Sequence, residues 1–174
     1  MRIMRHLAEI PDHQRDGMPS RSHPNTAEYL MTLVATTGIH HVRLTVTDID
    51  RSRAFYRDVL GFEIAAESPG RPEDPQVRSD PAQLYGGVVF QTNGMLFGLR
   101  PVADATDRFD SERVGLDHLS FTVASVGELS AVASRLDEAD IEHGEVTELE
   151  AFGIAILSFS DPDGIHLELT APLG

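Results

Sequence analysis

The stretch Ile39-His-His-Val-Arg-Leu-Thr-Val46 returns later in the chain as Leu116-Asp-His-Leu-Ser-Phe-Thr-Val123. When the two stretches are aligned, His41 falls on His118, and the Thr-Val pair that ends each stretch coincides. Apolar and polar residues alternate in both, which predicts two equivalent β-strands, each with one apolar and one polar face. The chain therefore contains an internal repeat, and a histidine occupies the same strand position in each copy.

A second pair of stretches extends this repeat. Gly94-Met-Leu-Phe-Gly-Leu-Arg100 aligns with Gly164-Ile-His-Leu-Glu-Leu-Thr170, so that Glu168 falls on Gly98. Helical spacing of apolar residues predicts a helix after the first strand of each copy, at 50–60 and 127–140. Further strands are predicted from 62, at 85–92, 94–100, 144–148, 153–160 and 164–170, with 68–83 as a long loop.

Each copy thus has the order βαβββ, and we predict an α+β fold of two tandem modules. Module one is expected at 38–101 and module two at 115–172, with residues 1–37 as a flexible N-terminal tail. The modules are expected to form a curved mixed sheet around a pocket, with the helices on the outer face.

Composition excludes several classes of function. The chain has 14 basic and 28 acidic residues among 174, a net charge of −14, which disfavours nucleic acid and anionic membranes as partners. No apolar run approaches the roughly 20 residues of a membrane span, and no signal peptide is recognisable, so we expect a cytoplasmic protein. Cysteine is absent and every basic residue is arginine, which excludes thiolate ligands and lysine Schiff bases.

The polar strand faces hold candidate metal ligands. His41, His118 and Glu168 occupy equivalent or neighbouring positions of the repeat, on the polar side of their strands. Two imidazoles and one carboxylate suit a six-coordinate divalent metal that keeps open positions. We therefore predict that these three residues bind one divalent metal ion, which could be Fe, Mn, Ni, Zn or Co; a vestigial or metal-free pocket is the alternative.

The segment 39–62 resembles the opening of vicinal oxygen chelate proteins, and Asp161-Pro-Asp-Gly-Ile-His-Leu-Glu-Leu169 resembles their last hairpin. This superfamily includes glyoxalase I, extradiol dioxygenases, fosfomycin-resistance enzymes and bleomycin-binding proteins, and the resemblance covers roughly 38–172. It implies paired βαβββ modules around a metal held by His41, His118 and Glu168, and a homodimer. The fourth ligand position of glyoxalase I matches Gly98, which has no side chain, and the catalytic tyrosine of extradiol enzymes matches near Ser158.

We accordingly predict a metal-dependent enzyme of the glyoxalase or dioxygenase type, either a dioxygenase or a lyase or isomerase. Its substrate would be a small molecule that chelates the metal through adjacent oxygens. The alternative is a metal-free protein of the bleomycin-resistance type that binds a small molecule such as an antibiotic, and a third possibility is an interaction subunit with an inert pocket.

Other residues of the polar faces are candidates for substrate binding and proton transfer. Arg43 and Arg100 could hold a substrate carboxylate or phosphate, and Ser158 could also contact the substrate. His166 is a candidate general base beside Glu168, which we also count as catalytic. Histidines and acids outside these faces are not expected at the site: His6, His13, His23, His40 and Asp117.

Overall fold

The computed structural model describes residues 33, 34 and 36–174, and the chain divides into two units, Met1–Gly38 and Ile39–Gly174. The tail predicted at 1–37 lies almost wholly outside the described residues, as do its three histidines. Every helix and strand of the described residues belongs to the second unit.

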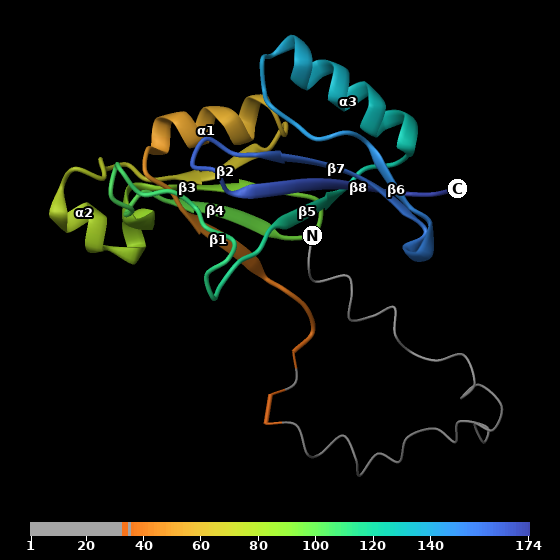
Figure 1. Ribbon diagram of the computed structural model, residues 1–174. Helices are drawn as coiled ribbons and strands as arrows, with labels where there is room; N and C mark the ends of the chain where they lie inside the picture. The colour runs from red at the N-terminus through yellow and green to blue at the C-terminus, as the bar shows by residue number, and fades with distance from the viewer. Residues whose placement is uncertain (1–32, 35) are drawn as a thin grey trace. The chain divides into compact units, whose positions relative to one another are not determined.

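The second unit contains two four-stranded sheets with the same topology (Figure 1). In the first, the strand order is β1-β4-β3-β2, where β1 and β4 are parallel and the other neighbours antiparallel. The second has the order β5-β8-β7-β6 and the same directions. The predicted α+β fold of two βαβββ repeats is confirmed, and its mixed sheet consists of two separately hydrogen-bonded halves. The strands are β1 (His41–Thr45), β2 (Glu63–Glu67), β3 (Val88–Gln91), β4 (Leu96–Arg100), β5 (Leu119–Thr122), β6 (Thr147–Leu149), β7 (Ile154–Ser160) and β8 (His166–Pro172).

Strand register preserves the alignment of the two copies in space. Arg43 of β1 lies opposite Gly98 of β4, and Ser120 of β5 lies opposite Glu168 of β8. Arg43 and Ser120 are equivalent in the repeat, and so are Gly98 and Glu168. The two polar faces therefore have the same geometry and different side chains.

One helix from each repeat lies on the same side of the sheets, α1 (Ile49–Asp58) and α3 (Val126–Glu138), as Figure 1 shows. Asp48 caps α1 by accepting a 3.0 Å hydrogen bond from the amide of Arg51, and Ser125 caps α3 in the same way. The helices bury Tyr56 and Leu129 completely against the apolar strand faces. This leaves the opposite faces of both sheets to the polar residues.

The prediction of a loop at 68–83 is wrong in part. This segment contains the helix α2 (Pro75–Ser79) and the start of the 3-10 segment η4 (Pro81–Gly86). In both, an aspartate precedes a proline: Asp74 and Asp80 each accept a 2.8 Å hydrogen bond from the amide two residues on. An N-cap acid followed by proline is a helix-start signal that overrides the turn-rich composition. Since η4 continues to Gly86, β3 also begins three residues later than predicted.

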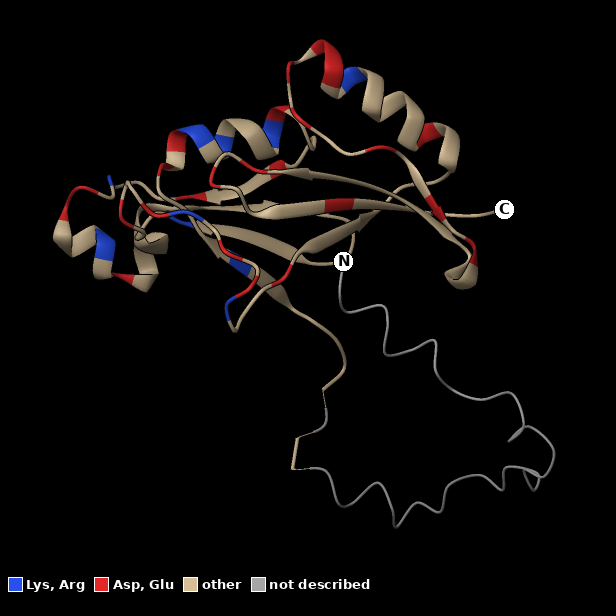
Figure 2. Cartoon of the chain, viewed as in Figure 1, with Lys and Arg blue, Asp and Glu red and all other residues tan. Residues whose placement is uncertain are grey.

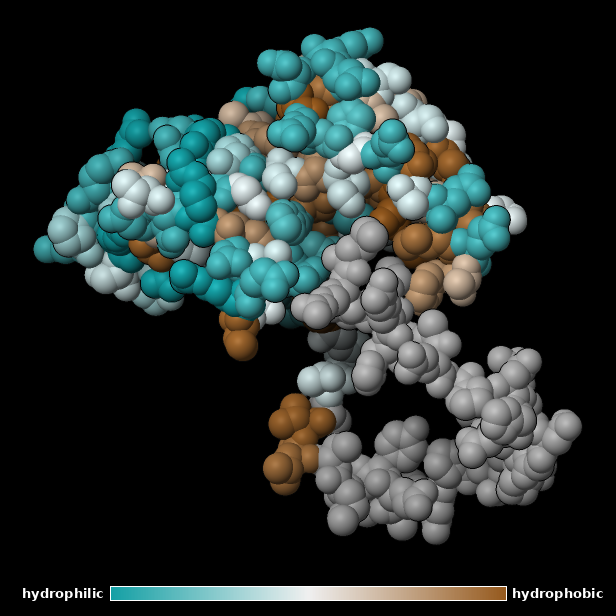
Figure 3. Space-filling model, viewed as in Figure 1, coloured by the Kyte–Doolittle hydropathy of each residue, from teal (hydrophilic) through white to brown (hydrophobic). Residues whose placement is uncertain are grey.

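Acidic residues are spread over helices, loops and strands (Figure 2), so the charge of −14 is not concentrated in one element. Among the described residues in Figure 3, hydrophilic ones cover much of the surface in view, and hydrophobic ones form patches between them. Among the described residues, no helix has the length and apolar composition needed to cross a membrane.

Candidate functional site

The polar face of the first sheet is open to solvent. His41, Arg43 and Thr45 are exposed on β1, whereas Leu44 between them is buried, so the predicted alternation holds. The Nδ1 atom of His41 lies 3.0 Å from Nδ1 of His40, so that one ring donates a proton to the other. His40, which was not expected at the site, is exposed beside His41, because β1 begins only at the following residue.

The second sheet presents the equivalent face. His118 is exposed directly before β5, and its Nδ1 lies 2.5 Å from the Asp117 carboxylate. This hydrogen bond from His118 lowers the pKa of Asp117. Since Nδ1 is occupied in both His41 and His118, the outer nitrogen Nε2 of each is the one left for a ligand.

Glu168 stands in the middle of a row of polar side chains across this sheet. It is opposite Ser120 of β5 on one side and Ser158 of β7 on the other. Its Oε1 accepts a 3.1 Å hydrogen bond from the hydroxyl of Thr170, which lies 2.5 Å from the hydroxyl of Ser120. The carboxylate is half-buried, and this network fixes its orientation.

His166 belongs to the same face, two residues before Glu168. It is exposed, and its ring lies against Phe109 of the segment that connects the two sheets, with the ring centres 5.4 Å apart. Ser160 of β7 lies opposite His166 in the strand register. The imidazole is therefore held beside the row that contains Glu168, with its nitrogens free of protein hydrogen bonds among the described residues.

The chain does not by itself assemble the predicted ligand set. Within residues 33, 34 and 36–174, no three His, Asp or Glu side chains lie close enough together to hold a metal ion. His41 is on one sheet, whereas His118 and Glu168 are on the other. The assignment of all three to one metal stays a prediction, and a single copy does not complete such a site.

Arg43 occupies the space above Gly98 on the first sheet. A Cβ atom added to Gly98 would lie 3.1 Å from Nε of Arg43, so the arginine fills the place that the repeat assigns to a carboxylate. Arg43 and Arg100 both lie over the ring of Tyr85, with Cζ at 5.5 Å and 4.0 Å from its centre. These distances are typical of cation–π contacts.

Sequence reasoning did not identify Tyr85, which it assigned to the start of a strand. The glycine pair Gly86-Gly87 after it is the signal that could have marked a turn there. Gly87 is required at its position, since an added Cβ would lie 2.0 Å from the carbonyl oxygen of Leu99.

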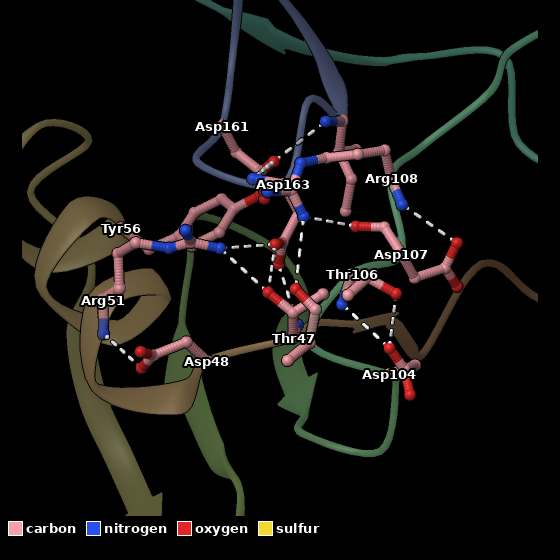
Figure 4. Close-up of polar contacts among 12 residues, drawn as sticks. Thr47, Asp48, Arg51, Tyr56, Asp104, Thr106, Asp107, Arg108, Asp161 and Asp163 are labelled. Carbon is pink, nitrogen blue, oxygen red and sulfur yellow. Dashed lines mark hydrogen bonds and ion pairs between the residues drawn. The ribbon is translucent and has the colours of Figure 1, made fainter.

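A separate polar cluster joins the two repeats (Figure 4). The hydroxyl of Thr47 donates a 2.5 Å hydrogen bond to Asp163, which also accepts one from Arg51. Burial raises the pKa of Tyr56 and the pKa of Asp161, whose side chains are hydrogen-bonded to each other. These bonds link Thr47, Arg51 and Tyr56 of the first repeat to Asp161 and Asp163 of the second, so the cluster holds the repeats together.

Beside this cluster lies an open cavity of about 260 Å³. It is bounded by the connecting segment, by the turn before β8 and by the end of β1. None of the predicted site residues lines it. Its lining includes Thr45, Thr47, Phe109, Asp163 and Ile165.

Known proteins share both the sequence pattern and the fold of this chain. The profile of the Glyoxalase/Bleomycin resistance protein/Dioxygenase superfamily matches residues 38–169. The uncharacterized protein YwkD of Bacillus subtilis is 33% identical over 131 residues, which cover 75% of this chain and 94% of that protein. The putative ring-cleaving dioxygenase MhqO of the same organism is 27% identical over 134 residues, 77% of this chain and 40% of MhqO.

Among solved structures, a glyoxylase/bleomycin resistance protein/dioxygenase domain from Frankia sp. EAN1pec is similar, with a TM-score of 0.61 and 29% identity. The match covers 79% of this chain and 93% of that domain.

Proposed function

Because the chain belongs to the Glyoxalase/Bleomycin resistance protein/Dioxygenase superfamily, we propose that it is a metal-dependent enzyme whose small substrate chelates the metal through two adjacent oxygens. The reaction would be that of a dioxygenase, or of a lyase or isomerase. The observation that carries this proposal is the pair of equivalent histidines, His41 and His118, each of which has Nδ1 occupied and so leaves Nε2 for a ligand.

The donor set suits a divalent ion chemically, and its distribution supports a site shared between two copies. We propose a homodimer in which the His41 face of one copy meets the His118 and Glu168 face of the other. The support is that both faces are open, and that the described residues of a single chain bring no three ligands together. A second copy would also convert two open faces into the enclosed pocket that catalysis requires.

Each residue then has a definite task. His41, His118 and Glu168 would hold the metal, which when bound stabilises charge that develops on a chelated substrate oxygen. His166 would take a proton from the substrate and return it, since it lies on the same face and two residues from Glu168. Ser158, opposite Glu168, would donate a hydrogen bond to a substrate oxygen.

Metal analysis tests the proposal directly. The purified protein, and protein stripped and reloaded with Fe, Mn, Ni, Zn or Co, is expected to bind one ion per chain. His41→Ala, His118→Ala and Glu168→Ala should each weaken binding by at least about 100-fold, because each removes one of three protein ligands.

His143→Ala and Glu148→Gln are matched controls, because these residues belong to the second repeat and lie away from its polar face. Both should keep full metal content. A protein that neither contains nor gains stoichiometric metal would overturn the proposal. If metal binds, a screen of catechols, 2-oxo acids and epoxides tests for turnover. Saturable binding without turnover would favour the antibiotic-binding alternative.

A further inference from the structure

Two arginines share one aromatic ring on the polar face of the first sheet. Arg100 lies 4.0 Å and Arg43 5.5 Å from the centre of the Tyr85 ring, measured from each Cζ. Arg43 comes from β1 and Arg100 from the parallel neighbour β4. Two guanidinium groups converge here although their mutual repulsion opposes it.

No carboxylate of the described residues neutralises this pair. Acidic residues outnumber arginines two to one in the chain, yet neither Arg43 nor Arg100 forms an ion pair within the part of the chain that the structure describes. The Nε atom of Arg100 is buried and has no hydrogen-bond partner there. Buried donors are nearly always satisfied in native proteins, so an orphaned guanidinium nitrogen points to an absent acceptor.

The backbone is strained to bring the ring into place. Leu84 and Tyr85 have φ values of +53° and +61°, in the left-handed region that residues with a side chain seldom adopt. Such a conformation persists where the surrounding structure imposes it, and it is frequent at ligand-binding sites. Here it places the ring of Tyr85 beneath both arginines.

The repeat adds an independent observation. The second copy has the carboxylate of Glu168 where the first has Gly98, and the side chain of Arg43 occupies the space above that glycine. The two faces are therefore opposite in charge at equivalent positions: one offers a ligand for a cation, and the other offers donors for an anion.

We propose that Arg43 and Arg100, supported by Tyr85, form a binding subsite for an oxyanion of the substrate, either a carboxylate or a phosphonate. Paired guanidinium donors match such groups, and Nε of Arg100 supplies the donor that lacks a partner. Arg43 is two residues from His41 on the same strand face, a rise of roughly 6.6 Å. Resting on the proposed function, this places the anionic group on the same strand face as the proposed metal ligand His41.

The test uses metal-free, full-length protein at constant ionic strength, titrated with acetate and with methylphosphonate. Binding is followed by NMR through the Nε–H signals of the arginines. At least one anion should shift the Arg100 signal saturably, and the anion that does so identifies the class of group. Arg43→Gln and Arg100→Gln should each weaken that binding roughly tenfold or more, because each removes a charged donor.

Arg135→Gln is the control, since Arg135 is exposed on α3 and forms no ion pair with a described residue. It should leave anion binding unchanged. If neither anion saturates, or if Arg135→Gln weakens binding as much as Arg43→Gln, the subsite does not exist. Glu168→Gln separates this inference from the proposed function, because it should abolish metal binding and leave the binding of acetate or methylphosphonate intact.

Discussion

Tyr56 of α1 donates a 3.0 Å hydrogen bond from its hydroxyl to the carboxylate of Asp161, which lies 105 residues later in the turn between β7 and β8. The same carboxylate accepts the amides of Asp163 and Ile165 at 2.9 Å and 2.8 Å. One buried acid thus shapes the turn of the second repeat and attaches it to the helix of the first.

Removing this hydroxyl should destabilise the fold. Tyr56→Phe leaves one oxygen of a buried carboxylate without its donor, so we expect the free energy of unfolding to fall by roughly 1–3 kcal/mol. Urea denaturation at pH 7 measures the loss. Tyr85→Phe is the control, because the Tyr85 hydroxyl has no hydrogen-bond partner among the described residues, and an equal loss in both variants would contradict the role of the Tyr56–Asp161 bond.

Stability should also depend on pH through Asp161. Burial raises the pKa of this carboxyl above that of the unfolded chain, where it is about 3.9. The folded state therefore holds the proton more tightly, and the stabilisation this gives is complete below the unfolded pKa and is lost as pH rises through the folded pKa.

The comparison of wild type with Asp161→Asn isolates this effect, because asparagine does not ionise and its side-chain oxygen can still accept the two amides. As pH rises from 4 to 8, the free energy of unfolding of the wild type should fall relative to that of the variant. A wild type that gains stability relative to the variant over this range would show that the carboxylate is favoured in the fold.

A shared metal site predicts complementation between two inactive variants. In a mixed dimer of His41→Ala and Glu168→Ala chains, one site loses both ligands and the other keeps all three. If copies assort at random after refolding together, about a quarter of the metal sites should be restored. Metal content of the mixture, compared with each variant alone, measures this. No recovery, in chains shown to have exchanged, would mean that the ligands come from one copy or that the site is not formed.

Gly98→Glu should weaken anion binding at the first sheet and strengthen metal binding. The new side chain would start 3.1 Å from Nε of Arg43, so its carboxylate would pair with the arginines or displace them. We expect the affinity for acetate or methylphosphonate to fall roughly tenfold or more, because an internal anion competes for the same donors. Metal affinity should rise, since ligand charge increases.

Gly98→Ala tests whether charge or bulk is responsible. The alanine methyl requires the flexible Arg43 side chain to move by only a few tenths of an ångström. It should retain most of the anion binding. If Ala and Glu at this position reduce anion binding equally, crowding rather than charge would explain the loss.

The sequence predicted the elements well where the signals are local. Alternation in 39–46 and 116–123 depends on the two-residue period of a strand, and it correctly assigned His41 to the exposed face of β1. His118 is also exposed, but it lies directly before β5. The helices of 68–83 could also have been predicted, since Asp74-Pro75 and Asp80-Pro81 are start signals. Proline and aspartate are common both in turns and at helix starts, so the composition of 68–83 also fits a loop.

Local signals in the chain specify the fold: two copies of one pattern of periods, caps and turns predict two sheets of identical topology, because these signals act between near neighbours. Which side chains meet depends on how the elements pack in three dimensions. A strand's phase tells which face a residue occupies but not how far apart two separately hydrogen-bonded sheets lie. The sequence therefore could not reveal that His41 and Glu168 lie on different sheets of one copy and do not share a metal-binding cluster there. Nor could it reveal that Tyr85, which together with Leu84 has a left-handed backbone, lies beneath Arg43 and Arg100.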